Sequence, residues 1–273
     1  MSLGIRLKGA RANFILGIAS LLFLTVTVLG QTPSQPAATP APTSRRATER
    51  PFPAARYIPP HNYDQRNIKL NLRFDWEQEQ AIGSATITLA PTVKDLRRVD
   101  FDAGLMTVSG ATLLNGSPLK FEYDEMKEKL SILLDRAYQP NEELTVVISY
   151  RTNKPTAARS LALGGGGLTF IKPRPDDPTR PRQIWTQGES ETNHFWFPSF
   201  DHPNDFVTTE IVATVEKPLM VISNGALLGT KENSDGTRTF DWKIDQPHAK
   251  FVKASIAGLV CPRNGIYTID GGP

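Results

Sequence analysis

The stretch Ile68–Trp76 reads IKLNLRFDW, and it decides the fold class. Apolar side chains at 68, 70, 72, 74 and 76 alternate with Lys, Asn, Arg and Asp at the positions between them. A period of two places the two kinds of side chain on opposite faces, so the stretch predicts a half-buried β-strand. After position 60, no window of 11 or more residues shows a capped helical period.

Further short strands are predicted along the chain, with turn residues between them. They are Ile82–Leu89, Leu105–Leu114, Leu119–Tyr123, Lys129–Leu134, Leu144–Tyr150, Val207–Val215, Thr237–Lys243 and Phe251–Val260. Asn115-Gly116 is a strong hairpin signal. We predict no regular structure for the glycine run Gly164–Gly167 or for the proline-rich segment Lys172–Arg182. Short strands at this spacing indicate an all-β protein, a β-sandwich of two or three sheets.

The stretch Gln183–Asp205, QIWTQGESETNHFWFPSFDHPND, combines large aromatic rings with many polar groups. Pro198 and Pro203 exclude a helix there. One interpretation is a rigid, half-buried corner between two sheets, with its charged groups facing water. The other is a rim that faces a substrate.

This stretch resembles segments of the aminopeptidase N family of zinc metallopeptidases. Thr186–Glu189 is similar to the family's Gln-x-Glu segment, and Phe197–Asp205 to its Phe-Pro-Cys-x-Asp-Glu-Pro segment. Shorter likenesses at 219–225, 235–242 and 245–247 extend the resemblance over roughly residues 63–260. It implies that residues 61–262 form the family's saddle-shaped N-terminal β domain, with a tail at 263–273. In that family the domain leans over a zinc-bearing catalytic domain.

Catalytic and metal-binding motifs of the family do not occur in this sequence. None of the four histidines, His61, His194, His202 and His248, has the H-E-x-x-H spacing, and the Gly-Ala-Met-Glu-Asn motif is absent. We expect no catalytic residue, metal ligand or cofactor in this chain. The resemblance implies that zinc belongs to a catalytic domain, in cis in a full-length protein or in trans, and that the chain alone is inactive.

Gln187 and Glu189 are the predicted substrate-binding residues. In the family, these positions hold the free α-amino group of a peptide substrate. Side chains at i and i+2 of an extended segment point the same way, so they can converge on one ammonium. A charge-assisted hydrogen bond of this kind is worth about 1.5–3 kcal/mol. The alternative is an exposed polar pair on a loop.

His194, Asp201 and His202 offer a second cluster, either a metal or acid–base site or a structural group. We favour the structural interpretation, in which Asp201 binds backbone within its own Asp-His-Pro turn. The family has Arg-Arg where this chain has His194-Phe195, Glu at His202 and Cys at Ser199. Loss of a covering domain would expose apolar surface such as Phe195 or Trp196.

Residues 1–60 are predicted to precede the domain. A basic segment (Arg6, Lys8, Arg11) followed by the apolar run Phe14–Leu29 is typical of a signal peptide, residues 1–30, with an uncleaved membrane anchor as the alternative. Residues 31–60 hold eight of the 22 prolines and are predicted to form a disordered linker. We expect export to the periplasm, the cell envelope or the medium, with membrane contact only through this segment.

Net charge supports these expectations about partners. The chain carries +3 overall, but residues 1–60 contribute +6 and the remainder −3. The domain has no basic stripe, so nucleic acid is not an expected partner. Its single cysteine, Cys261, permits no internal disulfide. The main hypothesis is a substrate-recognition domain that grips peptide N-termini, and the alternative is a non-catalytic exported scaffold or peptide-binding module.

Overall fold

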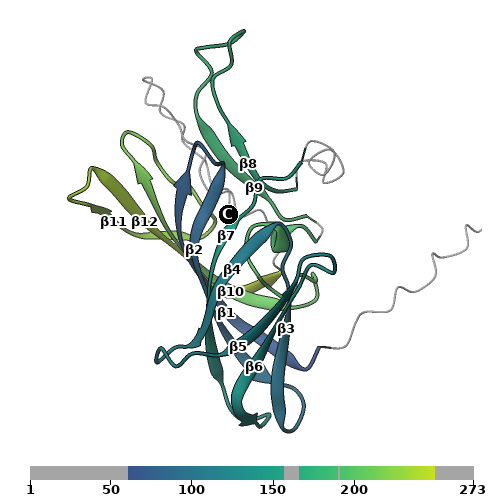
Figure 1. Ribbon diagram of the computed structural model, residues 1–273. Coiled ribbons are helices and arrows are strands. Elements are labelled where there is room, and N and C mark those ends of the chain that lie inside the picture. The colour runs from purple at the N-terminus through teal and green to yellow at the C-terminus, as the bar shows by residue number, and fades with distance from the viewer. Residues whose placement is uncertain (1–60, 157–165, 190, 250–273) are drawn as a thin grey trace, which may run out of the picture. The chain divides into compact units, whose positions relative to one another are not determined.

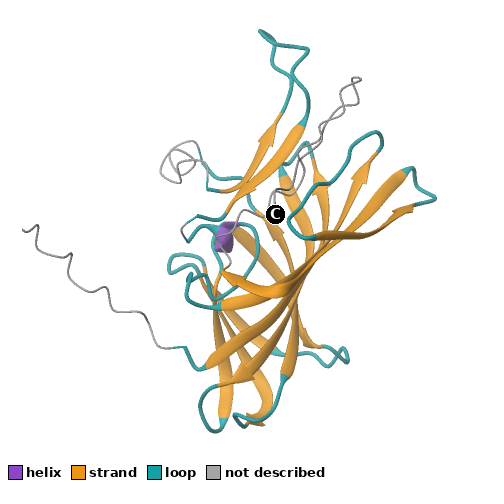
Figure 2. Ribbon diagram, turned by 180° about the vertical axis from the view of Figure 1, so that it is seen from behind, coloured by secondary structure: helices purple, strands orange, loops and turns teal. Residues whose placement is uncertain are grey.

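The structure is a computed structural model that describes residues 61–156, 166–189 and 191–249. In these ranges the regular structure is β-strand apart from one short 3-10 helix, η1 (Asn193–Phe195) (Figures 1 and 2). The predicted all-β class is therefore confirmed. The predicted signal peptide, linker, last strand (Phe251–Val260) and tail lie outside the described residues. Among the residues that the structure describes, no helix has the length and apolar character needed to cross a bilayer.

The larger sheet has seven strands. They are β1 (Tyr63–Asp75), β2 (Gln80–Pro91), β4 (Met106–Leu113), β7 (Leu144–Thr152), β10 (Phe206–Glu216), β11 (Ala226–Glu232) and β12 (Thr237–Ala249). Their order is β11-β12-β10-β1-β2-β7-β4, and β1 and β10 run parallel. The predicted alternation in β1 holds, since Ile68, Leu70 and Leu72 are buried.

The second sheet has three strands, in the order β3 (Leu96–Asp102), β6 (Lys129–Tyr138) and β5 (Lys120–Asp124). Its apolar face lies against the larger sheet, and both sheets contribute to one core, which contains Phe101 and Ile132 of the smaller sheet and Ile87 and Ile148 of the larger one. The predicted sandwich of packed sheets is thus present. β3 was not predicted, because a bulge between Leu96 and Arg98 breaks the period of two.

The Asn115-Gly116 turn forms where it was predicted, with Gly116 at φ 88°. The hairpin pairing after it is short, because Thr112 and Pro118 make a single bridge. Beyond that bridge β4 pairs with β7, while β5 pairs with β6. The turn therefore passes the chain from the larger sheet to the smaller one.

A two-stranded ribbon, β8 (Gly167–Ile171) and β9 (Gln183–Gln187), stands out from one end of the larger sheet (Figure 1). Neither strand was predicted as one. Gly167 belongs to the glycine run for which no regular structure was predicted, yet it is a packing position in β8: it has φ 81°, and a Cβ there would lie 3.0 Å from the Cβ of Phe195. The segment Lys172–Arg182 is the irregular connection that was predicted.

Aromatic and charged contacts fix this ribbon to the turn between β1 and β2. The guanidinium of Arg182 lies 4.0 Å from the ring centre of Trp76, and Phe170 packs on the same ring at 5.5 Å, edge to face. Glu79 in that turn pairs with Lys172 at 2.9 Å and with Lys154 at 2.7 Å. Because an isolated two-stranded ribbon is marginally stable, these contacts hold β9 in place.

Two neighbouring residues of β6 test the sandwich. Ile132 is fully buried, whereas the side chain of Leu133 points away from the core and is 50% exposed. We expect Ile132→Ala to lower the free energy of unfolding by about 3 kcal/mol, and Leu133→Ala by less than about 1 kcal/mol. Urea unfolding followed by tryptophan fluorescence measures both, and equal losses would contradict the packing of this sheet against the larger one.

Candidate functional site

The loop of residues 193–205, called here the aromatic loop, packs its rings into the core. Trp196, Phe197 and Phe200 belong to the same buried cluster as the two sheets. Phe195 is 7% exposed and Trp196 is 1% exposed, so the expectation that they form uncovered apolar surface is wrong. The burial of the rings between the sheets agrees with the corner interpretation. Asp201 and Asp205 are also buried, so the part of that interpretation that turned the charged groups toward water is wrong for these two residues.

Backbone hydrogen bonds tie the aromatic loop to the second sheet and its connection. Ser199 and Asp102 exchange both backbone bonds, at 2.8 and 3.1 Å. The N–H of Gly104 donates to the carbonyl of His194 at 2.8 Å. The loop is therefore an added partner of β3 rather than a free surface segment. Ser199, where the family has cysteine, is fully buried, and its hydroxyl has no hydrogen-bond partner in the described structure.

Gln65 ties the same loop to the larger sheet. It lies at the bulge in β1 and is fully buried. Its amide nitrogen donates to the carbonyl of Phe200 at 3.2 Å and to Oδ2 of Asp205 at 2.5 Å, and its amide oxygen accepts from the N–H of Phe200 at 3.2 Å. Sequence reasoning missed this residue, because a glutamine at the start of a strand carries no local signal.

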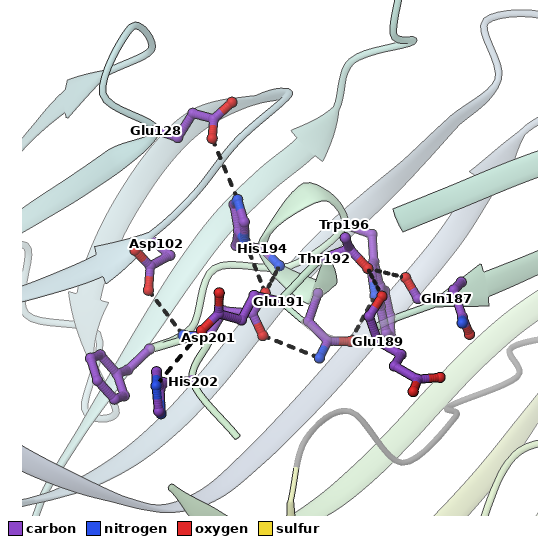
Figure 3. A network of polar contacts seen from close by, with 12 residues as sticks. Asp102, Glu128, Gln187, Glu189, Glu191, Thr192, His194, Trp196, Asp201 and His202 are labelled. Atoms are coloured by element: carbon purple, nitrogen blue, oxygen red, sulfur yellow. Dashed lines mark hydrogen bonds and ion pairs between the residues drawn. The ribbon is translucent and has the colours of Figure 1, made fainter. Parts of the chain in front are cut away.

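Asp201, within the aromatic loop, is the centre of a polar network (Figure 3). Its carboxylate is buried and accepts hydrogen bonds from Asn193 Nδ2 at 3.2 Å, from the backbone N–H of His194 at 3.0 Å and from His194 Nδ1 at 2.8 Å. Its own N–H donates to Asp102 Oδ2 at 2.9 Å. The donors to the carboxylate lie seven and eight residues earlier in the chain. The expectation that Asp201 binds backbone within its own Asp-His-Pro turn is therefore wrong.

Only part of the predicted histidine cluster is brought together. His194 bonds Asp201 and has its Nε2 3.5 Å from Glu128 Oε2, while His202 lies apart, beside Glu191 at 3.7 Å. In the described ranges, no group of three or more His, Cys, Asp or Glu side chains is arranged to hold a metal ion. The cluster has the character of a structural ion pair.

The charges around His194 shift its pKa upward. Burial lowers the pKa of His194, but the hydrogen bond and negative charge of Asp201, with the charges of Asp102 and Glu128, outweigh that effect. The imidazolium therefore stabilises the folded state, because its carboxylate partners are in place only when the loop is folded.

Gln187 and Glu189 lie on the other side of this network from His194 (Figure 3). Gln187 is the last residue of β9 and is half-buried, and Glu189 is exposed two residues later. Neither side chain has a hydrogen bond or ion pair with another described residue. Their backbone is held, since Thr192 Oγ1 donates to the Gln187 carbonyl at 2.6 Å and the Thr192 N–H to the Gly188 carbonyl at 3.2 Å.

This arrangement suits the binding of a cation. An amide oxygen and a free carboxylate stand two residues apart on a braced turn, and both are accessible to a ligand. Because Glu189 lies beyond the end of β9, strand register alone does not make the two side chains converge. The turn 187–189 sets their relation instead.

The raised pKa of His194 predicts a pH-dependent stability. The contribution of the pair is full below the ordinary histidine pKa of about 6.5 and is lost as the pH rises through the higher pKa of the folded state. We expect the free energy of unfolding to fall between about pH 6 and about pH 8.5, and to fall less in His194→Gln. Urea titrations at both pH values measure this. The same pH dependence in both proteins would contradict it.

Comparison with known proteins agrees with this fold. The family described as peptidase M1 N-terminal domain matches residues 59–251. Leucine aminopeptidase 2 of Vanderwaltozyma polyspora is 22% identical over 215 residues, 76% of this chain and 31% of that protein. Transcription initiation factor TFIID subunit 2 of Gallus gallus is 21% identical over 236 residues, 76% of this chain and 20% of that protein. The chain thus spans less than a third of the length of either relative.

Solved structures show the same architecture. An M1 zinc metallopeptidase from Deinococcus radiodurans superimposes with a TM-score of 0.58 at 20% identity, over 72% of this chain and 42% of that one. Leukotriene A4 hydrolase from Saccharomyces cerevisiae gives 0.54 at 17% identity, over 72% and 29%. These likenesses establish the fold, and the family match covers most of the sequence. The chain therefore belongs to the peptidase M1 N-terminal domain family.

Proposed function

We propose that this chain is the substrate-recognition domain of an M1 aminopeptidase, in which Gln187 and Glu189 bind the free α-amino group of a peptide. The observation that carries the proposal is the pair of unengaged acceptors on the braced turn after β9. A related M1 zinc metallopeptidase from Deinococcus radiodurans has been solved with a Tyr-Ser-Ala substrate. That supports a peptide as the ligand class.

The chemistry of the pair fits an ammonium group. Glu189 supplies a full negative charge, and no described Lys or Arg neutralises it. The Gln187 amide oxygen supplies a second acceptor, which a cation of three N–H donors can use at the same time. Holding the amine fixes which peptide bond is presented to the reacting centre, so the role is one of register.

The described residues contain no set of ligands that fits zinc. In this proposal zinc belongs to a catalytic domain of the M1 family with which the chain acts, in the same polypeptide or as a partner, because the similar solved structures are M1 zinc metallopeptidases. Bond cleavage is assigned to that domain. The residues of this chain bind and orient the substrate.

Removal of the Glu189 carboxylate tests the proposal. In a protein that carries this domain together with its catalytic domain, we expect Glu189→Ala to lower kcat/KM for peptides about 10- to 100-fold, because one charge-assisted hydrogen bond is lost. Glu189→Gln keeps the shape of the side chain without its charge, so its kcat/KM should lie between those of the parent protein and Glu189→Ala. Steady-state hydrolysis of a tripeptide with a free N-terminus measures all three proteins.

Glu122→Gln serves as the matched control, since Glu122 is an exposed carboxylate on β5 of the second sheet. Its kcat/KM is expected to equal that of the parent protein. If Glu189→Ala stays within about twofold of the parent, amine binding at this site is refuted.

A second candidate function is a non-catalytic scaffold or peptide-binding module. It is favoured by one observation, the likeness to a TFIID subunit, whose name is that of a transcription factor component and not of a peptidase. Strand β11 lies at the edge of the larger sheet with all seven residues exposed, an arrangement open to strand addition. If substitutions in β11 abolish peptide binding and Glu189→Ala leaves that binding unchanged, the result would favour this candidate.

The proposal also includes export of the protein from the cytoplasm. It rests on the basic and apolar composition of residues 1–30 and on the proline-rich residues 31–60. A mature N-terminus near residue 30 in the secreted protein supports cleavage. An intact N-terminus in the membrane fraction supports the anchor.

A further inference from the structure

We propose that Asn193 is the positioning residue for the substrate-binding pair, an inference that rests on the amine-binding role of Gln187 and Glu189. Asn193 is the first residue of η1 and is 2% exposed, so its side chain is engaged with the protein interior. It acts through the backbone of the turn that carries the pair.

Both ends of the Asn193 side chain are held by partners of fixed character. Nδ2 donates to the Asp201 carboxylate at 3.2 Å, and Oδ1 accepts from the indole N–H of Trp196 at 3.3 Å. A carboxylate accepts only from the nitrogen and an indole donates only to the oxygen, so the amide has one orientation. Trp196 is fully buried, which leaves this plane no room to turn.

The amide plane lies directly against Gly188, between the two binding residues. A Cβ built on Gly188 would lie 2.7 Å from both Cγ and Nδ2 of Asn193, and closer still to Oδ1. The turn therefore rests on Asn193 at its midpoint, and only glycine fits there. Thr192, the preceding residue, bonds the carbonyls of Gln187 and Gly188. Residues 192 and 193 together support both sides of the turn.

This support has a functional consequence because Glu189 lies past the end of β9. No strand pairing fixes its direction relative to Gln187, so the contact with Asn193 does. Binding groups must be held to within about 0.5 Å of the productive geometry. Loss of the amide would let the turn move and separate the two acceptors.

Kinetics of double variants test the role in the protein that carries both domains. We expect Asn193→Ala to raise KM for a free tripeptide and lower kcat/KM about tenfold. Without Glu189 there is no carboxylate for the turn to hold in place relative to Gln187, so the kcat/KM of Asn193→Ala/Glu189→Ala should lie within about twofold of that of Glu189→Ala alone. Asn71→Ala, at an exposed asparagine on the outer face of β1, is the matched control and should leave KM unchanged.

The outcomes separate the two proposals. If the effects of Asn193→Ala and Glu189→Ala multiply, or if Asn193→Ala lowers kcat alone in proportion to lost folded protein, the positioning role is overturned while amine binding stands. If Glu189→Ala has no effect, the proposed function fails.

A stability cycle on the present chain tests the contact without any activity. Gly188→Ala is expected to lower Tm by about 5 °C, because its methyl group meets the buried amide. In the Asn193→Ala background the same change should cost less than half as much, since the obstruction is gone. Equal losses in both backgrounds would show that Asn193 does not press on the turn and would overturn the inference.

Discussion

The buried carboxylate of Asp201 is the interaction on which this structure depends. A charge removed from water must be satisfied by hydrogen bonds, and Asp201 takes its donors from Asn193 and His194 of η1. Those bonds fix the start of the aromatic loop relative to its later part. Asn193 also lies against Gly188, so the hydrogen bond that holds Asn193 to Asp201 also helps to position the turn that carries Gln187 and Glu189.

The sandwich supplies the frame that makes this burial possible. Ser199 pairs with Asp102 of β3, and Gln65 in the bulge of β1 bonds Phe200 and Asp205. The aromatic loop is thus bound to both sheets, and its rings fill the space between them. The ribbon that ends in Gln187 is held separately, through Trp76 and Glu79 of the turn between β1 and β2. Two independent supports therefore meet at the turn that carries Gln187 and Glu189.

Local patterns predicted the parts of the fold that local chemistry determines. The period of two gave β1, β2, β7 and β10, and Asn115-Gly116 gave the turn at that position. β3 was not predicted because its bulge interrupts the period of two. The ribbon β8-β9 was not predicted because its sequence is rich in glycine and proline, and tertiary contacts decide its conformation. Gln187 and Glu189 were proposed from a motif, whereas Gln65 and Asn193 act through partners brought together by folding. Such partners leave no pattern in a single sequence.

The most direct test is a crystal structure of this domain, joined to the M1 catalytic domain that the proposal assigns to it, with a tripeptide that has a free N-terminus. The central claim predicts the α-amino nitrogen at about 2.7–3.2 Å from an oxygen of Glu189 and from Oε1 of Gln187. A bound peptide whose amine contacts neither residue, while both side chains face solvent, would contradict it.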